Sequence, residues 1–263
     1  MDLSIIIVNW NSGKLVYECI KSINENTKSI KYEIIVVDND SSDKSYLDLV
    51  GKEENVRLIY SSENLGFSRG NNLGAKNAKG EYILCLNPDT IVLKDDINKA
   101  LAYIKEKKGD NLVGIRLLNK DRTLQISSCK FFNCISYFFS TFTMSNNMHY
   151  KNHETDWVMG AFMLLPRSLY FKISGFNESY FMYSEDLELC YRVKQVGGKV
   201  LFFSEAQIIH LYNQSGEKKW NSKRNKVVTD NLKKFVYENY TGINKLSTLL
   251  SIKFKSYIKE MVR

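Results

Sequence analysis

The chain has 263 residues, of which 44% are hydrophobic and 25% charged, and its formal net charge is +8. These proportions exclude an intrinsically disordered chain, and the lack of any run of about 18 apolar residues excludes a membrane-spanning helix. The five cysteines include no Cys-x-x-Cys pair, which predicts reduced thiols in a cytosolic protein and no disulfide framework or zinc site.

The first part of the chain alternates short apolar runs with segments of helical periodicity. Met1 and Asp2 precede no basic region, so we expect no secretory signal. Apolar runs at residues 3–8, 34–37, 56–60 and 82–86 predict buried strands. Residues 70–79 and 95–108 have helical spacing. This alternation predicts an α/β fold with a Rossmann-like, mainly parallel sheet flanked by helices.

The pattern changes after residue 110. Residues 157–165 form a buried apolar segment that stops at Pro166, and residues 185–195 form an amphipathic helix. Short strands are expected at 200–203 and 208–209, the second ending at His210. We therefore expect residues 1–110 and 111–215 to be two halves of one domain, followed by a basic helical tail at 216–263.

Polar clusters follow three of the predicted strands at the points where they end. They are Asn9-Trp10-Asn11, Asp38-Asn39-Asp40 and Asn87-Pro88-Asp89. Parallel sheets bind ligands at the carboxyl ends of their strands, so the clusters predict a binding site there. The alternative is that these loops are polar only because they are exposed.

Four titratable residues could supply the chemistry of such a site. They are Asp89 after a strand, the pair Glu185-Asp186 that opens a helix, and His210 at the end of a late strand. Carboxylate and imidazole ligands suit Mg²⁺ or Mn²⁺ shared with phosphates better than zinc. A carboxylate separate from the metal could act as general base.

Six short motifs and one histidine follow one another along the chain in an order that resembles a known family. They are the runs at residues 4–11, 36–43, 64–72, 80–90, 160–165 and 181–192, followed by His210. This set resembles the family 2 inverting glycosyltransferases with the type A nucleotide-sugar fold. The Asn-Pro-Asp-Thr form at 87–90 and the Gly-Phe-x-x-x-Asn-Asn stretch at 66–72 look most like rhamnosyltransferases. The resemblance covers residues 3 to about 212.

The resemblance implies a role for each matching residue in donor binding. Trp10 would lie against the pyrimidine, although a core tryptophan is the alternative, and Asp38 and Asn39 would contact base and ribose. Gly66 would allow close backbone approach, and Asn71 and Asn72 would face the nucleotide. The remaining expected donor-binding residues are Asn9, Phe67 and Asn87.

The resemblance also implies the metal ligands and the base. Asp89 corresponds to the last acid of the family's Asp-x-Asp motif and Asn87 replaces the first, so Asp89 and His210 would bind Mn²⁺ or Mg²⁺. Asp186 would take the proton from the acceptor hydroxyl in a single inverting displacement, with Glu185 as the competing candidate. The other carboxyl would cap the helix.

The implied function is transfer of a sugar, with L-rhamnose from dTDP-rhamnose favoured, onto a glycan or lipid-linked glycan in cell-surface polysaccharide synthesis. Alternatives are a UDP-sugar-dependent hexosyl or N-acetylhexosaminyl transferase, or a non-catalytic carbohydrate-binding module. A sugar-phosphate nucleotidyltransferase should have a Gly-rich loop after the first strand, which residues 9–13 lack. The aromatic stretch 131–142 is expected near the acceptor entrance, or else in a hydrophobic core or dimer contact.

The C-terminal segment carries the whole charge excess, since residues 216–263 hold twelve basic and four acidic side chains. Such a segment favours an anionic partner, unless it is only a solvated helical face. On a helix its apolar residues form one stripe: Ile243, Leu246, Leu250, Phe254, Tyr257, Ile258 and Met261. Lys245, Lys255, Lys259 and Arg263 lie opposite, with Lys253 near the boundary. This pattern is typical of a helix in a membrane interface on the cytoplasmic face, unless the stripe packs on the body; nucleic acid is not expected.

Overall fold

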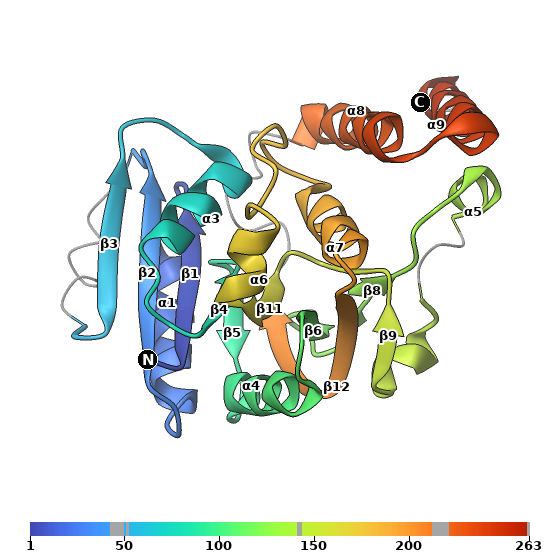
Figure 1. Cartoon of the computed structure of the whole chain (residues 1–263). Helices are drawn as coiled ribbons and strands as arrows, with labels where there is room; N and C mark the ends of the chain where they lie inside the picture. Colours follow the sequence, from blue (N-terminus) through green and yellow to red (C-terminus); the bar gives the residue numbers. More distant parts are fainter. Residues whose placement is uncertain (43–49, 51–52, 141–143, 212–220, 262–263) are drawn as a thin grey trace.

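The computed structural model describes residues 1–42, 50, 53–140, 144–211 and 221–261, and a ten-stranded mixed sheet forms its centre (Figure 1). The strands are β1 Leu3–Asn9, β2 Tyr32–Asn39, β3 Val56–Ser61, β4 Tyr82–Leu86, β5 Thr90–Val92, β6 Asn111–Leu118, β7 Leu124–Gln125, β9 His153–Thr155, β11 Phe162–Pro166 and β12 Lys199–His210. The main order is β3-β2-β1-β4-β11-β6-β12-β5, with β7 on β6 and β9 on β12. A separate small sheet pairs β8 Ser128–Cys129 with β10 Trp157–Val158.

Helices cover the sheet and continue beyond it. They are α1 Gly13–Asn26, α3 Gly66–Lys76, α4 Asp96–Lys107, α5 Cys134–Phe138, α6 Arg167–Lys172, α7 Glu185–Gln195, α8 Asn221–Asn239 and α9 Gly242–Met261, with a 3₁₀ turn at Asn146–Tyr150. This architecture confirms the predicted α/β fold with helices at its C-terminal end. None of the helices in the described part of the chain is long and apolar enough to cross a membrane.

The parallel part of the sheet brings the predicted polar clusters to one edge. β1 pairs in parallel with β2 and with β4, and Asn9 lies opposite Asp38 in the register. β3 extends this part in parallel beyond β2. Beyond β4 the sheet becomes mixed, because β11 runs antiparallel to both β4 and β6, whereas β12 runs parallel to β6.

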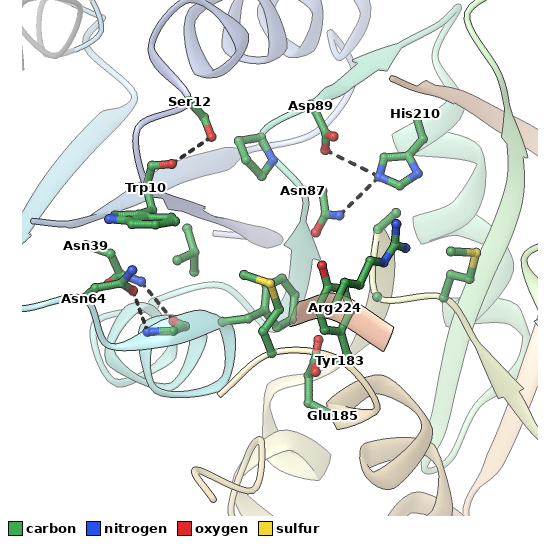
Figure 2. A pocket seen from close by; sticks show the side chains of 18 residues that line it. Trp10, Ser12, Asn39, Asn64, Asn87, Asp89, Tyr183, Glu185, His210 and Arg224 are labelled. Carbon is green, nitrogen blue, oxygen red and sulfur yellow. Dashed lines mark hydrogen bonds and ion pairs between the residues drawn. The ribbon is translucent and has the colours of Figure 1, made fainter. Parts of the chain in front are cut away.

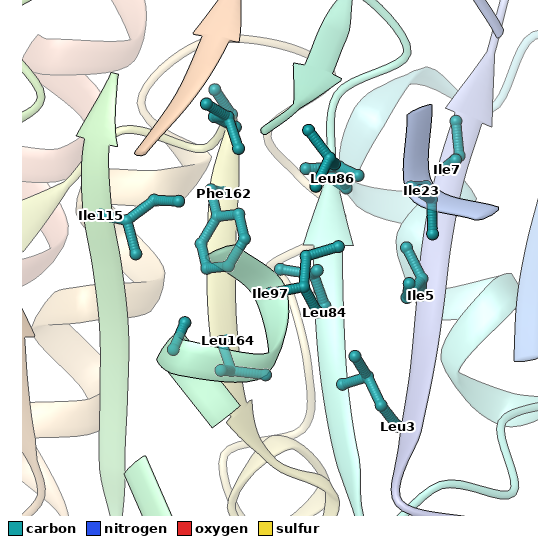
Figure 3. Close-up of a cluster of buried hydrophobic side chains, with 14 of the residues drawn as sticks. Leu3, Ile5, Ile7, Ile23, Leu84, Leu86, Ile97, Ile115, Phe162 and Leu164 are labelled. Carbon is teal, nitrogen blue, oxygen red and sulfur yellow. The ribbon is translucent and has the colours of Figure 1, made fainter. Parts of the chain in front are cut away.

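Side-chain alternation divides the core between the two faces of the sheet. Ile5 and Ile7 of β1 point into a cluster with α1 and α4 (Figure 3), while Ile6 between them points into a cluster with α3, α6 and α7. Because both faces are covered, every one of these isoleucines is fully buried. The near-continuous apolar sequence of β1 follows from this two-sided burial.

Two predicted elements differ in their bounds. The helix expected at 70–79 begins earlier, at Gly66, which has a φ of +71°. A Cβ at Gly66 would lie 2.5 Å from the carbonyl oxygen of Phe181, so the two segments meet only because this residue is a glycine. The strands expected at 200–203 and 208–209 form one strand, β12, with an irregularity between Phe203 and Gln207.

The C-terminal helices pack on the body of the molecule. A third apolar cluster joins Phe132 and Leu187 to Phe235 and Val236 of α8 and Ile252 of α9. Three residues of the aromatic stretch therefore belong to this core, Phe132 as a buried member and Phe131 and Tyr137 as partly buried ones, while Phe138 and Phe139 of the same stretch are exposed. The expected boundary at 215/216, Phe142, and the side chains of Lys259, Met261 and Arg263 lie outside the described residues. All five cysteines are free thiols.

Candidate active site

A cavity opens at the carboxyl ends of β1, β2 and β4, where the polar clusters meet (Figure 2). It is bounded by residues from both halves of the sheet and from α8. The lining residues are Val8, Trp10, Ser12, Asn39, Asn64, Gly66, Phe67, Asn87, Pro88, Asp89, Met159, Gly160, Ala161, Met182, Tyr183, Glu185, His210 and Arg224. Eight of the thirteen expected site residues line this cavity, and the other five, Asn9, Asp38, Asn71, Asn72 and Asp186, do not.

One wall carries the aromatic and amide groups. Trp10 lies above Asn39 and Asn64 at one side of the cavity (Figure 2). The Asn39 amide nitrogen donates to the carbonyl of Gly66 at 2.9 Å, whereas its Oδ1 is buried and makes no hydrogen bond within the described residues. An uncompensated buried acceptor is costly, so this oxygen is suited to receive an N–H donor from a ligand.

Asn9 and Asp38 directly precede Trp10 and Asn39 in the chain and do not line the cavity. Asn9 donates through Nδ2 to Asp38 Oδ1 and to Ser41 Oγ, both at 2.9 Å. All three residues are buried. These bonds hold the loops after β1 and β2 together, and so fix the position of Trp10 and Asn39.

Asn71 and Asn72, expected to face the nucleotide, do not line the cavity either. Asn72 Nδ2 donates to the Phe176 carbonyl at 2.9 Å, and its Oδ1 accepts from the Tyr170 hydroxyl at 2.7 Å and from the Phe176 amide at 2.9 Å. Asn71 donates to the Phe67 carbonyl at 3.0 Å. The structure thus uses Asn72 to join α3 to the segment that follows α6.

The opposite wall brings Asp89 and His210 together. Asp89 Oδ1 lies 3.4 Å from His210 Nε2, and both side chains are buried. His210 Nδ1 lies 2.7 Å from Gln125 Oε1, which can only accept, so Nδ1 donates to Gln125. The other ring nitrogen, Nε2, lies 3.3 Å from Asn87 Nδ2.

This donor set fits a divalent cation. The Asp89 carboxylate and the His210 imidazole, whose nearest atoms lie 3.4 Å apart, are both groups that can bind a divalent cation. Histidine held by a second hydrogen-bonding group is a common arrangement in metal sites, and Gln125 supplies that group. No cluster of three or more His, Cys, Asp or Glu side chains suited to a metal occurs in the described part of the chain. A cation here would therefore need phosphate oxygens as further ligands.

The acidic pair at the start of α7 has two different environments. Glu185 lines the cavity, and its Oε2 makes no hydrogen bond within the described residues. Asp186 does not line it, but its Oδ2 accepts from the amide of Gly160, a lining residue, at 2.9 Å, and its Oδ1 accepts from the amide of Leu187 at 2.8 Å.

Both carboxyl groups are buried, but their neighbours make them differ in acidity. Desolvation and the neighbouring Asp186 charge raise the pKa of Glu185 well above its usual value. Desolvation also raises the pKa of Asp186, but the amides of Gly160 and Leu187 oppose this rise because they stabilise its ionised form. Asp186 is therefore the more acidic of the two carboxyl groups.

A strained loop before α7 completes the cavity. Tyr183 and Ser184 have φ values of +72° and +66°, a conformation that side chains other than glycine rarely adopt. Asn231 of α8 donates through Nδ2 to the carbonyls of Met182 at 2.9 Å and Tyr183 at 2.7 Å. The Arg224 guanidinium of α8 lies 5.3 Å from the Tyr183 ring centroid.

Comparison with known proteins agrees with this geometry. Residues 4–174 match the family described as Glycosyl transferase family 2. The chain belongs to glycosyl transferase family 2. The predicted family is thereby confirmed.

Two curated relatives are sugar transferases by name. The rhamnosyltransferase WbbL of Escherichia coli K12 is 27% identical over 220 residues, which are 78% of this chain and 82% of WbbL. The low-salt glycan biosynthesis hexosyltransferase Agl10 of Haloferax volcanii is 32% identical over 201 residues, 74% of this chain and 62% of Agl10. The expected resemblance to rhamnosyltransferases is thus confirmed by the sequence similarity to WbbL.

Solved structures confirm the type A fold of this family 2 member. GalNAc-T7 with UDP, GalNAc and Mn²⁺ superposes with a TM-score of 0.66 at 19% identity, over 80% of this chain and 43% of that chain. Residues 1–349 of TarS from S. aureus with UDP-GlcNAc give a TM-score of 0.65 at 15% identity, over 95% of this chain and 70% of that chain. The chain spans less than half of GalNAc-T7 and most of the TarS fragment.

Some cavity residues were not anticipated from the sequence. Asn64 and Tyr183 lie inside the motifs at 64–72 and 181–192, so their position in those motifs could have predicted that they line the cavity. Gln125 orients His210 from a two-residue strand without any sequence pattern of its own. Arg224 belongs to the basic tail, where its neighbours in sequence are other cations, so nothing in the sequence distinguished it.

Proposed function

We propose that this family 2 glycosyltransferase transfers L-rhamnose from dTDP-rhamnose, with inversion, to a glycan or lipid-linked glycan acceptor in cell-surface polysaccharide synthesis. The observation that carries the proposal is the cavity that unites Trp10 and Asn39 with Asp89, His210 and Glu185, while Asp186 is hydrogen-bonded to the lining residue Gly160. The similarity to WbbL over most of its length supports rhamnose as the transferred sugar.

In this proposal the wall formed by Trp10 and Asn39 binds the pyrimidine. Trp10 stacks on the base, and the buried Asn39 Oδ1 accepts the N3–H that both uracil and thymine present. Asn9 and Asp38 hold the two loops in register for the base and ribose. Gly66 and Phe67 line the same side, with the Gly66 backbone open to close approach by the donor.

The proposed general base lies on α7, and the proposed metal ligands lie on the wall that carries Asp89. Asp186 accepts the proton of the acceptor hydroxyl, because it is the carboxyl of the pair that ionises more readily. A positioned base contributes about 10²–10⁴-fold to such a step. Asp89 and His210, with Asn87 beside them, would hold Mn²⁺ or Mg²⁺, which when bound supplies positive charge for the departing diphosphate.

We further propose that the protein works in the cytoplasm, in peripheral contact with the inner face of the membrane through residues 243–261. The apolar stripe of α9 is exposed, with relative accessibilities between 39% and 80% from Ile243 to Ile258. The opposite face, with Thr248, Ser251 and Ile252, is the one that packs on the body. The exposure of these six side chains supports membrane contact over the alternative that the stripe packs on the catalytic domain.

Exposed apolar side chains of α5 continue the stripe. The Phe138 ring of α5 stacks near Phe254 of α9, with centroids 6.1 Å apart, and Ile135 and Phe139 are exposed beside it. We call these side chains, together with the α9 stripe from Ile243 to Ile258, the α5/α9 surface. With the charge of the C-terminal segment it suits an anionic bilayer, to which each nearby Lys or Arg adds about 1 kcal/mol.

The test is a donor panel with the whole chain. Binding of dTDP-rhamnose, UDP-glucose, UDP-N-acetylglucosamine and GDP-mannose is measured by thermal shift with Mn²⁺, with Mg²⁺ and with EDTA. Release of nucleoside diphosphate is then followed with lipid-linked glycan acceptors. The proposal expects dTDP-rhamnose to stabilise the protein most and to release dTDP.

Each other outcome identifies an alternative. Preference for a UDP-sugar makes the protein a UDP-dependent hexosyl or N-acetylhexosaminyl transferase. Exchange of pyrophosphate into the donor makes it a nucleotidyltransferase. Absence of any donor effect favours a non-catalytic carbohydrate-binding module.

A further inference from the structure

Helix α8 lies outside the part of the chain that matches the family, residues 4–174, yet it reaches the cavity. Arg224, in its first turn, is a lining residue and extends toward the end of the cavity that holds Asn87 and His210 (Figure 2). Among the described lining residues it is the one with a permanent positive charge, since neither Lys nor another Arg occurs in the set.

The position of Arg224 is fixed by the strained loop before α7. Its guanidinium lies over the Tyr183 ring, 5.3 Å from the centroid, which is within the range of a cation–π contact. Asn231, two turns later on α8, holds the backbone of Met182 and Tyr183. Helix α8 therefore contacts the loop before α7 at two places, through Asn231 and through Arg224, at the edge of the cavity.

The charges around Arg224 indicate what it binds. The cavity also presents the Asp89 carboxylate, whereas Asn87, which by the family resemblance replaces the first acid of the Asp-x-Asp motif, brings no charge. One carboxylate fewer holds a metal ion less tightly, so more of the charge of a bound diphosphate is left for a protein cation to neutralise. A planar guanidinium is the side chain that pairs best with phosphate oxygens.

We propose that Arg224 binds the diphosphate of the nucleotide-sugar donor, so that α8 of the basic tail is part of the donor site. This inference rests on the proposed function, because it requires a nucleotide in the cavity. It assigns the tail a second role that is independent of the α5/α9 surface.

The experiment compares Arg224→Gln with Arg224→Lys in the full chain. Lys226→Gln is the matched control, since Lys226 lies on the same helix, is exposed and does not line the cavity, and its substitution removes the same charge. Titration calorimetry measures dTDP, UDP and the nucleosides thymidine and uridine, each with Mg²⁺ and with EDTA.

Arg224→Gln is expected to weaken dTDP or UDP binding about 10- to 100-fold, the usual effect of losing a charge-assisted hydrogen bond. Nucleoside affinity should stay unchanged, Arg224→Lys should restore part of the loss, and Lys226→Gln should behave as wild type. Equal losses for nucleoside and diphosphate, or an unchanged diphosphate affinity in Arg224→Gln, would overturn the inference while leaving the proposed function intact. Failure of the wild type to bind any nucleotide would instead overturn both.

Discussion

At the scale of single residues, the neighbouring carboxyl groups Glu185 and Asp186 differ in environment although both belong to the first turn of α7. Asp186→Asn should lower transfer about 10²–10⁴-fold and leave donor affinity nearly unchanged, because the base acts only on the acceptor proton. Glu185→Gln should retain more activity, since desolvation and the neighbouring Asp186 charge raise the pKa of Glu185 and make it the less readily ionised carboxyl of the pair. Turnover and donor affinity of both variants, measured side by side, check this assignment.

The pH dependence of the transfer rate and of thermal unfolding tests the roles of Glu185 and Asp186 independently. Burial raises the pKa of Asp186, so the rate should fall, as the pH is lowered, at a pH above the usual range of an aspartate. Burial raises the pKa of Glu185 more strongly than that of Asp186. Because the folded state then binds the Glu185 proton more tightly than the unfolded state does, the free energy of unfolding falls as the pH rises from the usual pKa of a glutamate toward the raised one. Glu185→Gln should therefore unfold at an equal or higher temperature than wild type at pH 8. An inactive Glu185→Gln beside an active Asp186→Asn would reverse the two roles.

At the scale of elements, α8 holds the loop before α7 in its strained conformation. Asn231→Ala removes both hydrogen bonds to the Met182 and Tyr183 carbonyls and should cost about 1–3 kcal/mol of stability. It should also weaken donor binding, because Met182 and Tyr183 line the cavity. Urea unfolding and dTDP titration measure the two effects.

Asn225→Ala is the control for this element, because Asn225 is an exposed asparagine of the same helix. It should change stability by less than about 0.5 kcal/mol. If Asn231→Ala and Asn225→Ala bind dTDP equally well, α8 does not support the donor site through this loop.

At the scale of the whole molecule, the α5/α9 surface lies at the same end as the cavity. The carboxyl ends of β1 and β2 and the helices α8 and α9 all lie at the top of the view in Figure 1. Sedimentation with anionic vesicles should therefore recover the full chain, and the triple substitution Leu246→Ser, Leu250→Ser, Phe254→Ser should reduce binding at least about tenfold. Neutral vesicles should bind less in both cases.

The matched control for the surface replaces apolar side chains that are exposed elsewhere. Tyr60→Ser with Phe171→Ser fits this purpose, since both residues are exposed outside α5 and α9. The control should sediment with vesicles as wild type does. Wild-type protein that ignores vesicles but is a dimer, which the triple substitution converts to a monomer, would assign the surface to a second copy of the chain.

The sequence by itself determined the strands and the edge at which the ligand binds. Two-sided burial requires continuous apolar runs, so β1, β2 and β4 were visible as runs, and the polar residues directly after them had to meet at one edge. The helix α7 and its acidic pair were likewise visible, because a periodic apolar face and its first residues are local features.

Only the tertiary structure decided which of these residues reach the cavity. Asn72 belongs to the same motif as Gly66, but its amide is used by Tyr170 and Phe176, which are about a hundred residues away in the chain. Asp186 and Glu185 are adjacent in sequence, and the amide of Gly160, 26 residues away, is one of the groups that make Asp186 the more acidic. Arg224 is one cation among many in the tail until α8 packs beside the loop before α7. Periodicity records which face of an element is buried, whereas partners brought together by folding leave no local pattern.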